Sequence, residues 1–122
     1  MKQVLSVGQC GFDHGAISRF LQTHFDVEIT PAPTASAATD LLRKQPFDLV
    51  LVNRQLDADG SEGLELVKAL QADAALATKP VMLVTNFPEY DRQAVDLGAV
   101  SGFGKAAMGS PDVVRRLEQF LK

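Results

Sequence analysis

Three apolar stretches of this sequence are each followed closely by a polar residue that could take part in chemistry. Asn53 and Thr85 each stand directly behind a run of four apolar residues, and Lys105 lies two residues behind a third stretch. Short apolar runs bounded by polar residues and glycine are typical of buried strands. An amide, a hydroxyl and an ammonium group include no carboxylate nucleophile, and lysine is the one group among them that could act as a base.

Strand-like and helix-like patterns alternate along the chain and would position these residues. Strands are expected at residues 4–7, 25–29, 49–52, 81–84 and 100–103. The runs at 49–52 and 81–84 lack polar alternation, which is typical of a parallel sheet covered on both faces. The segment TPAPTASAAT at residues 30–39 is interpreted as a loop.

Helix signals fill the intervals between the strands. We expect the first helix to begin at Asp13 as its N-cap, the second to follow Thr34 and the third to follow Ser61. The fourth should run from Pro88 to Gly98, and the fifth should be capped by Ser110 with Pro111 at its first position.

Five strand–helix units predict an α/β fold, (βα)5, with one doubly wound parallel sheet in the order 2-1-3-4-5. Residues 1–122 should form a single domain. In such sheets ligands bind beyond the carboxyl ends of the strands, at the switch point. The segments after Val7, Val52 and Phe103 should therefore meet at one edge.

Composition excludes several classes of protein. A net charge of -3 with scattered basic residues argues against nucleic-acid binding. Cys10 is the only cysteine, so no disulfide can form within the chain, and no apolar stretch approaches the roughly 20 residues of a membrane helix. We expect a cytoplasmic protein that contacts neither nucleic acid nor membrane.

The order and spacing of these segments resemble the receiver domains of two-component response regulators, over the whole chain. The resemblance rests on DLVLV at 48–52, the following DG and GLELV, PVMLVT at 80–85, and LGA ahead of Lys105. It implies a flavodoxin-like receiver fold and a role in phosphorelay signalling. In that family an aspartate after the third strand accepts a phosphoryl group, and two acidic residues after the first strand help it to hold Mg²⁺. A hydroxyl residue ends the fourth strand and a lysine follows the fifth.

Carried onto this chain, the resemblance is partial. Thr85 and Lys105 fit the hydroxyl and lysine positions, whereas Asn53 stands at the phosphoacceptor and Gly8 and Gln9 stand at the acidic pair. An amide is a poor nucleophile, and Mg²⁺ is usually held by carboxylates. We therefore expect no phosphorylation, no metal and no cofactor, and a mildly electropositive pocket around Lys105.

Two further departures concern the segment around the fifth strand. Ala106 replaces the proline that usually follows the lysine, so we expect a trans peptide bond and a rearranged loop. The family's switch aromatic would fall at Gly102, which leaves Phe103 as the candidate, with its side chain on the other face of the strand.

The resulting hypothesis is a pseudo-receiver, not an enzyme, that signals by binding a protein partner or a second copy of itself. By resemblance, the contact face would comprise the fourth helix, fifth strand and fifth helix, including Tyr90, Arg92, Ala94 and Phe103. Phe87 and Tyr90 are candidate aromatic anchors. The sequence identifies neither the partner, the pathway nor the oligomeric state, and leaves open whether a ligand replaces phosphorylation as the input.

Other interpretations remain open at this point. Asp57 could serve as a substitute phosphoacceptor with Mg²⁺, or Asp57 and Asp59 could simply solvate a turn. A flavodoxin-like ligand-binding domain or enzyme could use the strand-end side chains, which are Gln9, Cys10, Asn53, Thr85 and Lys105. Equally, Asn53 could bond its own loop, Thr85 could bond a loop amide, and Lys105 could pair with Asp57 or a backbone carbonyl.

Overall fold

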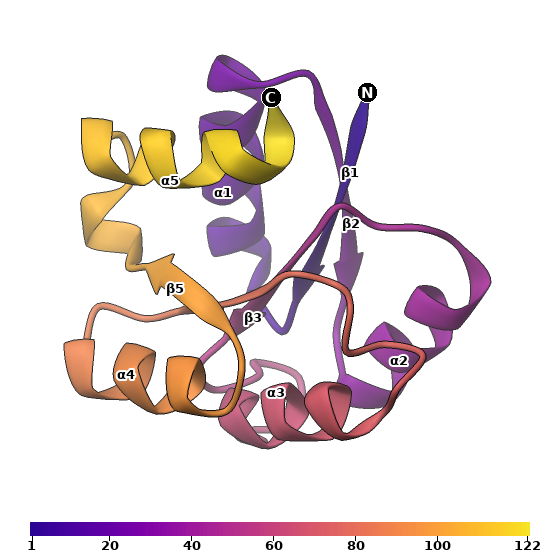
Figure 1. Cartoon of the computed structure of the whole chain (residues 1–122). Helices are drawn as coiled ribbons and strands as arrows, with labels where there is room; N and C mark the ends of the chain where they lie inside the picture. Colours follow the sequence, from indigo (N-terminus) through magenta and orange to yellow (C-terminus); the bar gives the residue numbers. More distant parts are fainter.

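The computed structural model describes residues 1–122 and shows one five-stranded sheet with helices on both faces (Figure 1). All strand pairs are parallel, and their order is β2-β1-β3-β4-β5, as predicted. The elements in chain order are β1 (Lys2–Val7), α1 (Gly11–His24), β2 (Val27–Ala32), α2 (Ala35–Lys44), β3 (Leu49–Asn53), α3 (Gly63–Ala72), β4 (Val81–Val84), α4 (Pro88–Asp96), β5 (Val100–Phe103), the 3-10 turn η1 (Lys105–Ala107) and α5 (Pro111–Leu121).

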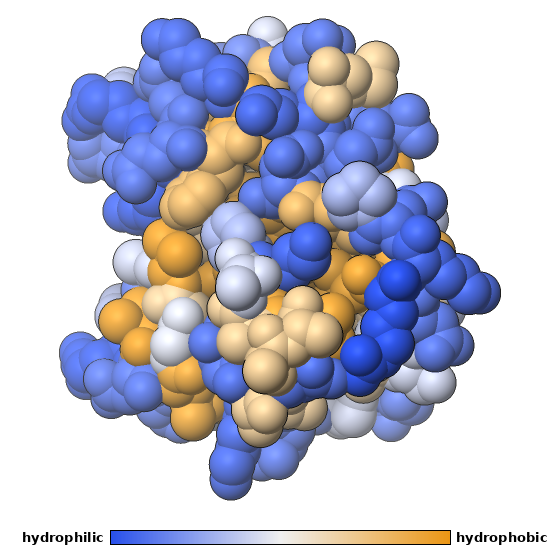
Figure 2. Space-filling view, turned by 45° about the vertical axis from the view of Figure 1, so that its right-hand side comes forward, coloured by the Kyte–Doolittle hydropathy of each residue, from blue (hydrophilic) through white to orange (hydrophobic).

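The helices form two layers, with α1 and α5 on one face of the sheet and α2, α3 and α4 on the other (Figure 1). Successive residues of β3 point alternately into two hydrophobic clusters: Val50 and Val52 into the α2–α4 side, Leu49 and Leu51 into the α1–α5 side. Burial on both faces explains why this run contains no polar residue. On the face shown in Figure 2, hydrophobic residues gather across the middle and lower part, and the upper part is mostly hydrophilic. None of the helices combines the length and apolar character needed to span a membrane.

Several predicted helix ends are confirmed. Thr34 and Ser110 cap α2 and α5 by accepting backbone N–H bonds from Ala37 and Val113, and Pro111 begins α5. Gly98 follows α4 with a φ of 110°, a conformation that side chains rarely adopt.

Two predicted boundaries near the amino end are wrong. The first helix begins at Gly11 and is capped by Cys10, whose sulfur accepts the N–H of Asp13, so Asp13 lies inside the first turn. The second strand covers Val27–Ala32 rather than 25–29, and the segment 30–39 is divided between β2 and α2. Pro31 lies within a strand because β2 is at the edge of the sheet, where a missing N–H costs no ladder bond.

The fifth strand contains an irregularity that decides where Phe103 points. Val100 pairs with Met82, and Phe103 pairs with Val84. Between these two pairs β5 advances by three residues and β4 by only two, so β5 contains one extra residue. The extra residue makes a β-bulge within Ser101–Gly102, and at Gly102 an added Cβ would overlap the carbonyl oxygen of Leu83. A side chain therefore does not fit at position 102 in this backbone.

Side chains from both flanking helices hold this bulge. Asp91 of α4 accepts the Gly102 N–H and the Ser101 hydroxyl, both at 2.8 Å, and Arg116 of α5 donates to the Gly102 carbonyl. Phe103 is then buried in the α1–α5 cluster, with its ring 6.2 Å from that of Phe20. Placing Phe103 on an exposed partner face was therefore wrong.

Candidate functional site

A cavity of about 510 Å³ opens at the carboxyl edge of the sheet, beyond β3, β4 and η1. Its walls include Asn53, Thr85 and Lys105, so the structure brings together the three polar residues that the sequence placed behind strands. Only two of its ten lining residues are hydrophobic, which makes the cavity polar. Gln9, a predicted member, does not line it, and both polar atoms of its side chain are buried without a hydrogen-bond partner.

Asn53 uses both ends of its amide in this cavity wall. Its Nδ2 donates to the carbonyl oxygens of Gln55 at 2.8 Å and Gly8 at 3.2 Å, and its Oδ1 accepts from Lys105 Nζ at 3.4 Å. Carbonyl oxygens accept but cannot donate, so only an N–H at position 53 can bond both of them, and the Gly8 carbonyl accepts the N–H of Asp57 as well. The structure thus confirms that Asn53 bonds its own loop, and it gives a reason for an amide where a receiver has a carboxylate.

Position 8 has no room for the acidic side chain that a receiver places there. Gly8 has a φ of 75°, and an added Cβ would overlap Leu56 Cδ2 and approach the Leu56 Cα to 2.9 Å. Leu56 is 1 % exposed and belongs to the core. The side chain of Leu56, which belongs to the β3–α3 loop, therefore fills the space beside Gly8.

The receiver domains that the sequence resembles hold Mg²⁺ at this edge of the sheet, but the residues of this chain do not fit that ion. Mg²⁺ requires oxygen ligands, usually with one or two carboxylates. The place beside Gly8 holds a leucine, Asn53 Nδ2 is turned toward the carbonyls, and no three histidine, cysteine or carboxylate residues gather anywhere as a metal cluster.

Lys105 forms an ion pair that the sequence interpretation missed. Its Nζ lies 2.7 Å from Asp13 Oδ2, and hydrogen bonding to Lys105 lowers the pKa of Asp13 below its usual range. Both side chains are about a quarter to a third exposed (26 % and 30 %). Lys105 therefore pairs with neither Asp57 nor a backbone carbonyl, the two partners that the sequence suggested, and Asp13 balances the positive charge of Lys105 itself. The two residues are 92 positions apart, and no local pattern links them.

Thr85 and Asn86 shape the opposite wall. Thr85 Oγ1 accepts the N–H of Phe87 at 3.1 Å, which confirms that the hydroxyl bonds a loop amide. Asn86 Oδ1 accepts the N–H of Ala106 at 3.0 Å and so fastens η1 to the end of β4. The predicted trans bond before Ala106 is confirmed, and the loop there contains the turn η1.

The acidic residues of the β3–α3 loop behave differently from one another. Asp59 accepts the N–H and hydroxyl of Ser61 at 3.0 and 2.7 Å, which lowers the Asp59 pKa and confirms its role in a turn. Asp57 is exposed and lines the cavity, and its own N–H donates to the Gly8 carbonyl.

The predicted partner residues of α4 separate into exposed and buried ones. Phe87 is 53 % exposed and makes an edge-to-face contact with Tyr90, with ring centres 6.2 Å apart. Arg92 is exposed, whereas Ala94 is completely buried in the core, so Ala94 was wrongly placed on a contact surface. The guanidinium of Arg54, which the sequence interpretation did not single out, lies 4.8 Å above the Tyr90 ring.

Comparison of the structure with solved structures identifies the fold as that of response-regulator receiver domains. The receiver domain of a DNA-binding response regulator (merR) from Colwellia psychrerythraea 34H matches with a TM-score of 0.80 and 21 % identity, covering 98 % of this chain and 97 % of that one. A putative response regulator from Chloroflexus aurantiacus J-10-fl matches with a TM-score of 0.84 and 17 % identity, covering 98 % and 96 %. The chemotaxis response regulator CheY4 of Vibrio cholerae matches with a TM-score of 0.73 and 21 % identity, covering 98 % and 97 %. No protein-family model and no curated protein sequence matches the chain.

Proposed function

We propose that this chain is a pseudo-receiver: a signalling module that acts by binding another protein and is controlled neither by aspartyl phosphorylation nor by Mg²⁺. It performs no chemistry of its own and acts in the cytoplasm. The receiver fold, shared with response regulators over nearly the whole chain, supports the signalling role.

The hydrogen bonding of Asn53 carries the proposal. A phosphoacceptor must present a free carboxylate oxygen to the incoming phosphoryl group. Asn53 instead presents an amide whose N–H groups are both engaged by backbone carbonyls. Leu56 beside Gly8 and Asp13 beside Lys105 extend the same pattern, because each fills or neutralises a place that phosphoryl chemistry would need open.

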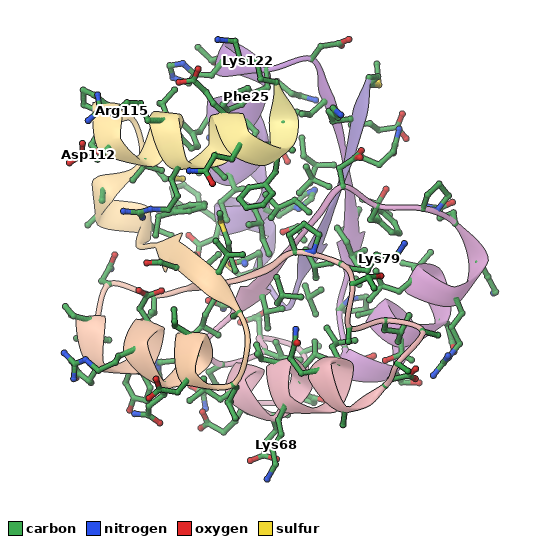
Figure 3. The ribbon with its side chains drawn as sticks, in the orientation of Figure 1. Phe25, Lys68, Lys79, Asp112, Arg115 and Lys122 are labelled. Carbon is green, nitrogen blue, oxygen red and sulfur yellow. The ribbon has the colours of Figure 1, made fainter.

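The amino-terminal part of α4 supports a protein partner as the means of action. Phe87, Tyr90 and Arg92 lie along its first turns, and Phe87 exposes about half of its surface. Exposed aromatic and arginine side chains supply much of the binding energy at protein interfaces. Among the basic residues labelled in Figure 3, Lys68 and Lys79 lie far from Arg115 in α5 and from Lys122 directly after it, and this scatter supports a partner other than nucleic acid.

Phosphotransfer is tested directly by incubating the protein with Mg²⁺ and acetyl phosphate and measuring the intact mass. We expect no mass gain in the wild type or in Asn53→Asp, because that substitution restores the acceptor without a metal site. A response-regulator receiver with its full acidic set serves as the positive control. Amide NMR spectra with Mg²⁺ and then beryllofluoride should also stay unchanged around Asn53, Thr85 and Lys105. A phosphorylated wild-type protein would refute the proposal.

A second candidate is a phosphorelay receiver that uses Asp57, and one observation favours it. Asp57 is exposed and lines the same cavity as Thr85 and Lys105. This alternative predicts a mass gain that Asp57→Asn abolishes and Asp59→Asn preserves.

A further inference from the structure

Arg54 is the unusual cation of this molecule, because it is half-buried and its guanidinium has no anionic partner. Three other arginines are engaged: Arg43 with Asp73, Arg115 with Asp112, and Arg116 with the Gly102 carbonyl. Arg19 and Arg92 are exposed to solvent. Arg54 makes its contact with the face of Tyr90 and lines the cavity at the strand ends, while none of its guanidinium N–H groups donates to the protein.

Further unused donors face the same cavity from the β4–α4 side. The Thr85 oxygen accepts a bond, but its hydroxyl hydrogen has no acceptor in the chain. The backbone N–H and the Nδ2 of Asn86 likewise donate to no protein group. Arg54, Thr85 and Asn86 thus present an arginine fork, a hydroxyl and an amide to one polar space of about 510 Å³.

The charges around the cavity place its free positive charge at Arg54. The lining includes two cations, Arg54 and Lys105, and one carboxylate, Asp57. Asp13 neutralises Lys105 from α1, while Asp57 is exposed at the loop side of the opening. The cation–π contact with the Tyr90 ring, 4.8 Å from the guanidinium carbon, holds the Arg54 side chain beside the cavity, and a guanidinium can bind a carboxylate or phosphate with two parallel hydrogen bonds.

We propose that this cavity reversibly binds the oxyanion group of a small molecule, a carboxylate or a phosphate, through Arg54, Thr85 and Asn86, without a metal and without covalent attachment. The bound anion would join the loop after β3 to the loop after β4. Because the Arg54 guanidinium contacts the ring of Tyr90 in α4, an anion bound to Arg54 would be coupled to the position of α4. The proposal rests on the pseudo-receiver function, for which the bound anion would be the input signal. A ligand that binds one arrangement of α4 better than another shifts the population toward that arrangement.

The test is an amide NMR titration of the full chain with sodium phosphate and, separately, sodium acetate, each against sodium chloride at equal ionic strength. Saturable shifts at Arg54, Thr85 and Asn86 with either oxyanion support the site, and the salt that saturates identifies phosphate or carboxylate as the group. Arg54→Gln should weaken this binding by at least about tenfold, because hydrogen bonds to charged groups are the strong ones. Arg54→Lys should also weaken it, since it keeps the charge but loses the fork. The matched control Arg92→Gln, also on an arginine but exposed and outside the cavity, should bind as the wild type does.

Other results would overturn the inference. Linear shifts equal to those of chloride would mean an ionic-strength effect and no site. Saturable binding that survives Arg54→Gln would place any anion elsewhere. In either case the intact-mass and beryllofluoride measurements still stand as the separate test of the pseudo-receiver proposal, which fails only if the protein is phosphorylated or binds the Mg²⁺–beryllofluoride complex.

Discussion

Replacing Asn53 by aspartate should destabilise the protein, although it restores the residue that a receiver carries there. The change removes two N–H donors and sets a carboxylate oxygen against the carbonyls of Gln55 and Gly8, which lie 2.8 and 3.2 Å from the present nitrogen. Each lost hydrogen bond costs about 0.5–1.5 kcal/mol, so the pair costs about 1–3 kcal/mol. Lys105 offsets part of this, but its Nζ is 3.4 Å away and already paired with Asp13.

Urea and thermal unfolding at pH 7, followed by circular dichroism, measure this effect. We expect a free-energy loss of about 1–3 kcal/mol, and at roughly 4 °C per kcal/mol a domain of this size should lose about 4–12 °C in Tm. Asn86→Asp is a matched control on the same cavity, because Asn86 uses only its oxygen, which accepts from Ala106 N–H, and a carboxylate keeps that bond. The control should stay within about 0.5 kcal/mol of the wild type. An Asn53→Asp variant as stable as the wild type would refute the assignment of Asn53 as a stabilising N–H donor to these carbonyls.

Three further substitutions test the surrounding structure. Gly8→Asp should cost about 2–5 kcal/mol in urea unfolding, because it combines a left-handed backbone with overlap on Leu56, and added Mg²⁺ should not restore the loss. For Asp13→Asn we expect a loss of about 1 kcal/mol at pH 7. Because Lys105 lowers the folded-state pKa of Asp13, its stabilisation is present above the ordinary value of 3.8 and is lost as the pH falls below it. Wild-type and variant unfolding curves should therefore converge below that pH, and a constant gap would contradict the ion pair. Asp91→Ala should speed hydrogen exchange at the Gly102 amide by tenfold or more, at roughly 1.4 kcal/mol per tenfold, whereas Asp96→Ala, on the same helix, should leave it unchanged.

The sequence predicted the elements whose signals are local. A few neighbouring residues were enough to predict β3 and β4 from their unbroken apolar runs and the start of α5 from Ser110–Pro111. The structure confirms all three predictions. Phe25 misled the strand prediction because it looks like the start of an apolar run, yet its N–H closes the last turn of α1 on Leu21.

Contacts between distant segments were the part that could not be predicted. Asp13 lies in a helical first turn, where an acidic residue is already explained by the helix dipole, so nothing in the sequence marks it as the partner of Lys105. Similarly, Leu56 looks like an ordinary loop leucine until the fold sets it against Gly8. Ala94 was wrongly assigned to the contact surface because a small residue on a mostly polar helix does not show whether it faces the core or the solvent.

The bulge in β5 has a consequence for how other molecules can recognise this protein. β5 and β2 are the two outermost strands, where an extended peptide would otherwise add itself to the sheet. At β5 the Gly102 N–H and carbonyl are already taken by Asp91 and Arg116, and at β2 Pro31 has no N–H to give. Each border of the sheet thus has one position that cannot pair with an added strand, Gly102 on β5 and Pro31 on β2, which disfavours strand addition there. For the proposed pseudo-receiver we therefore expect a partner to contact side chains on the helices rather than to add a strand, and the same two positions disfavour edge-to-edge pairing of two copies.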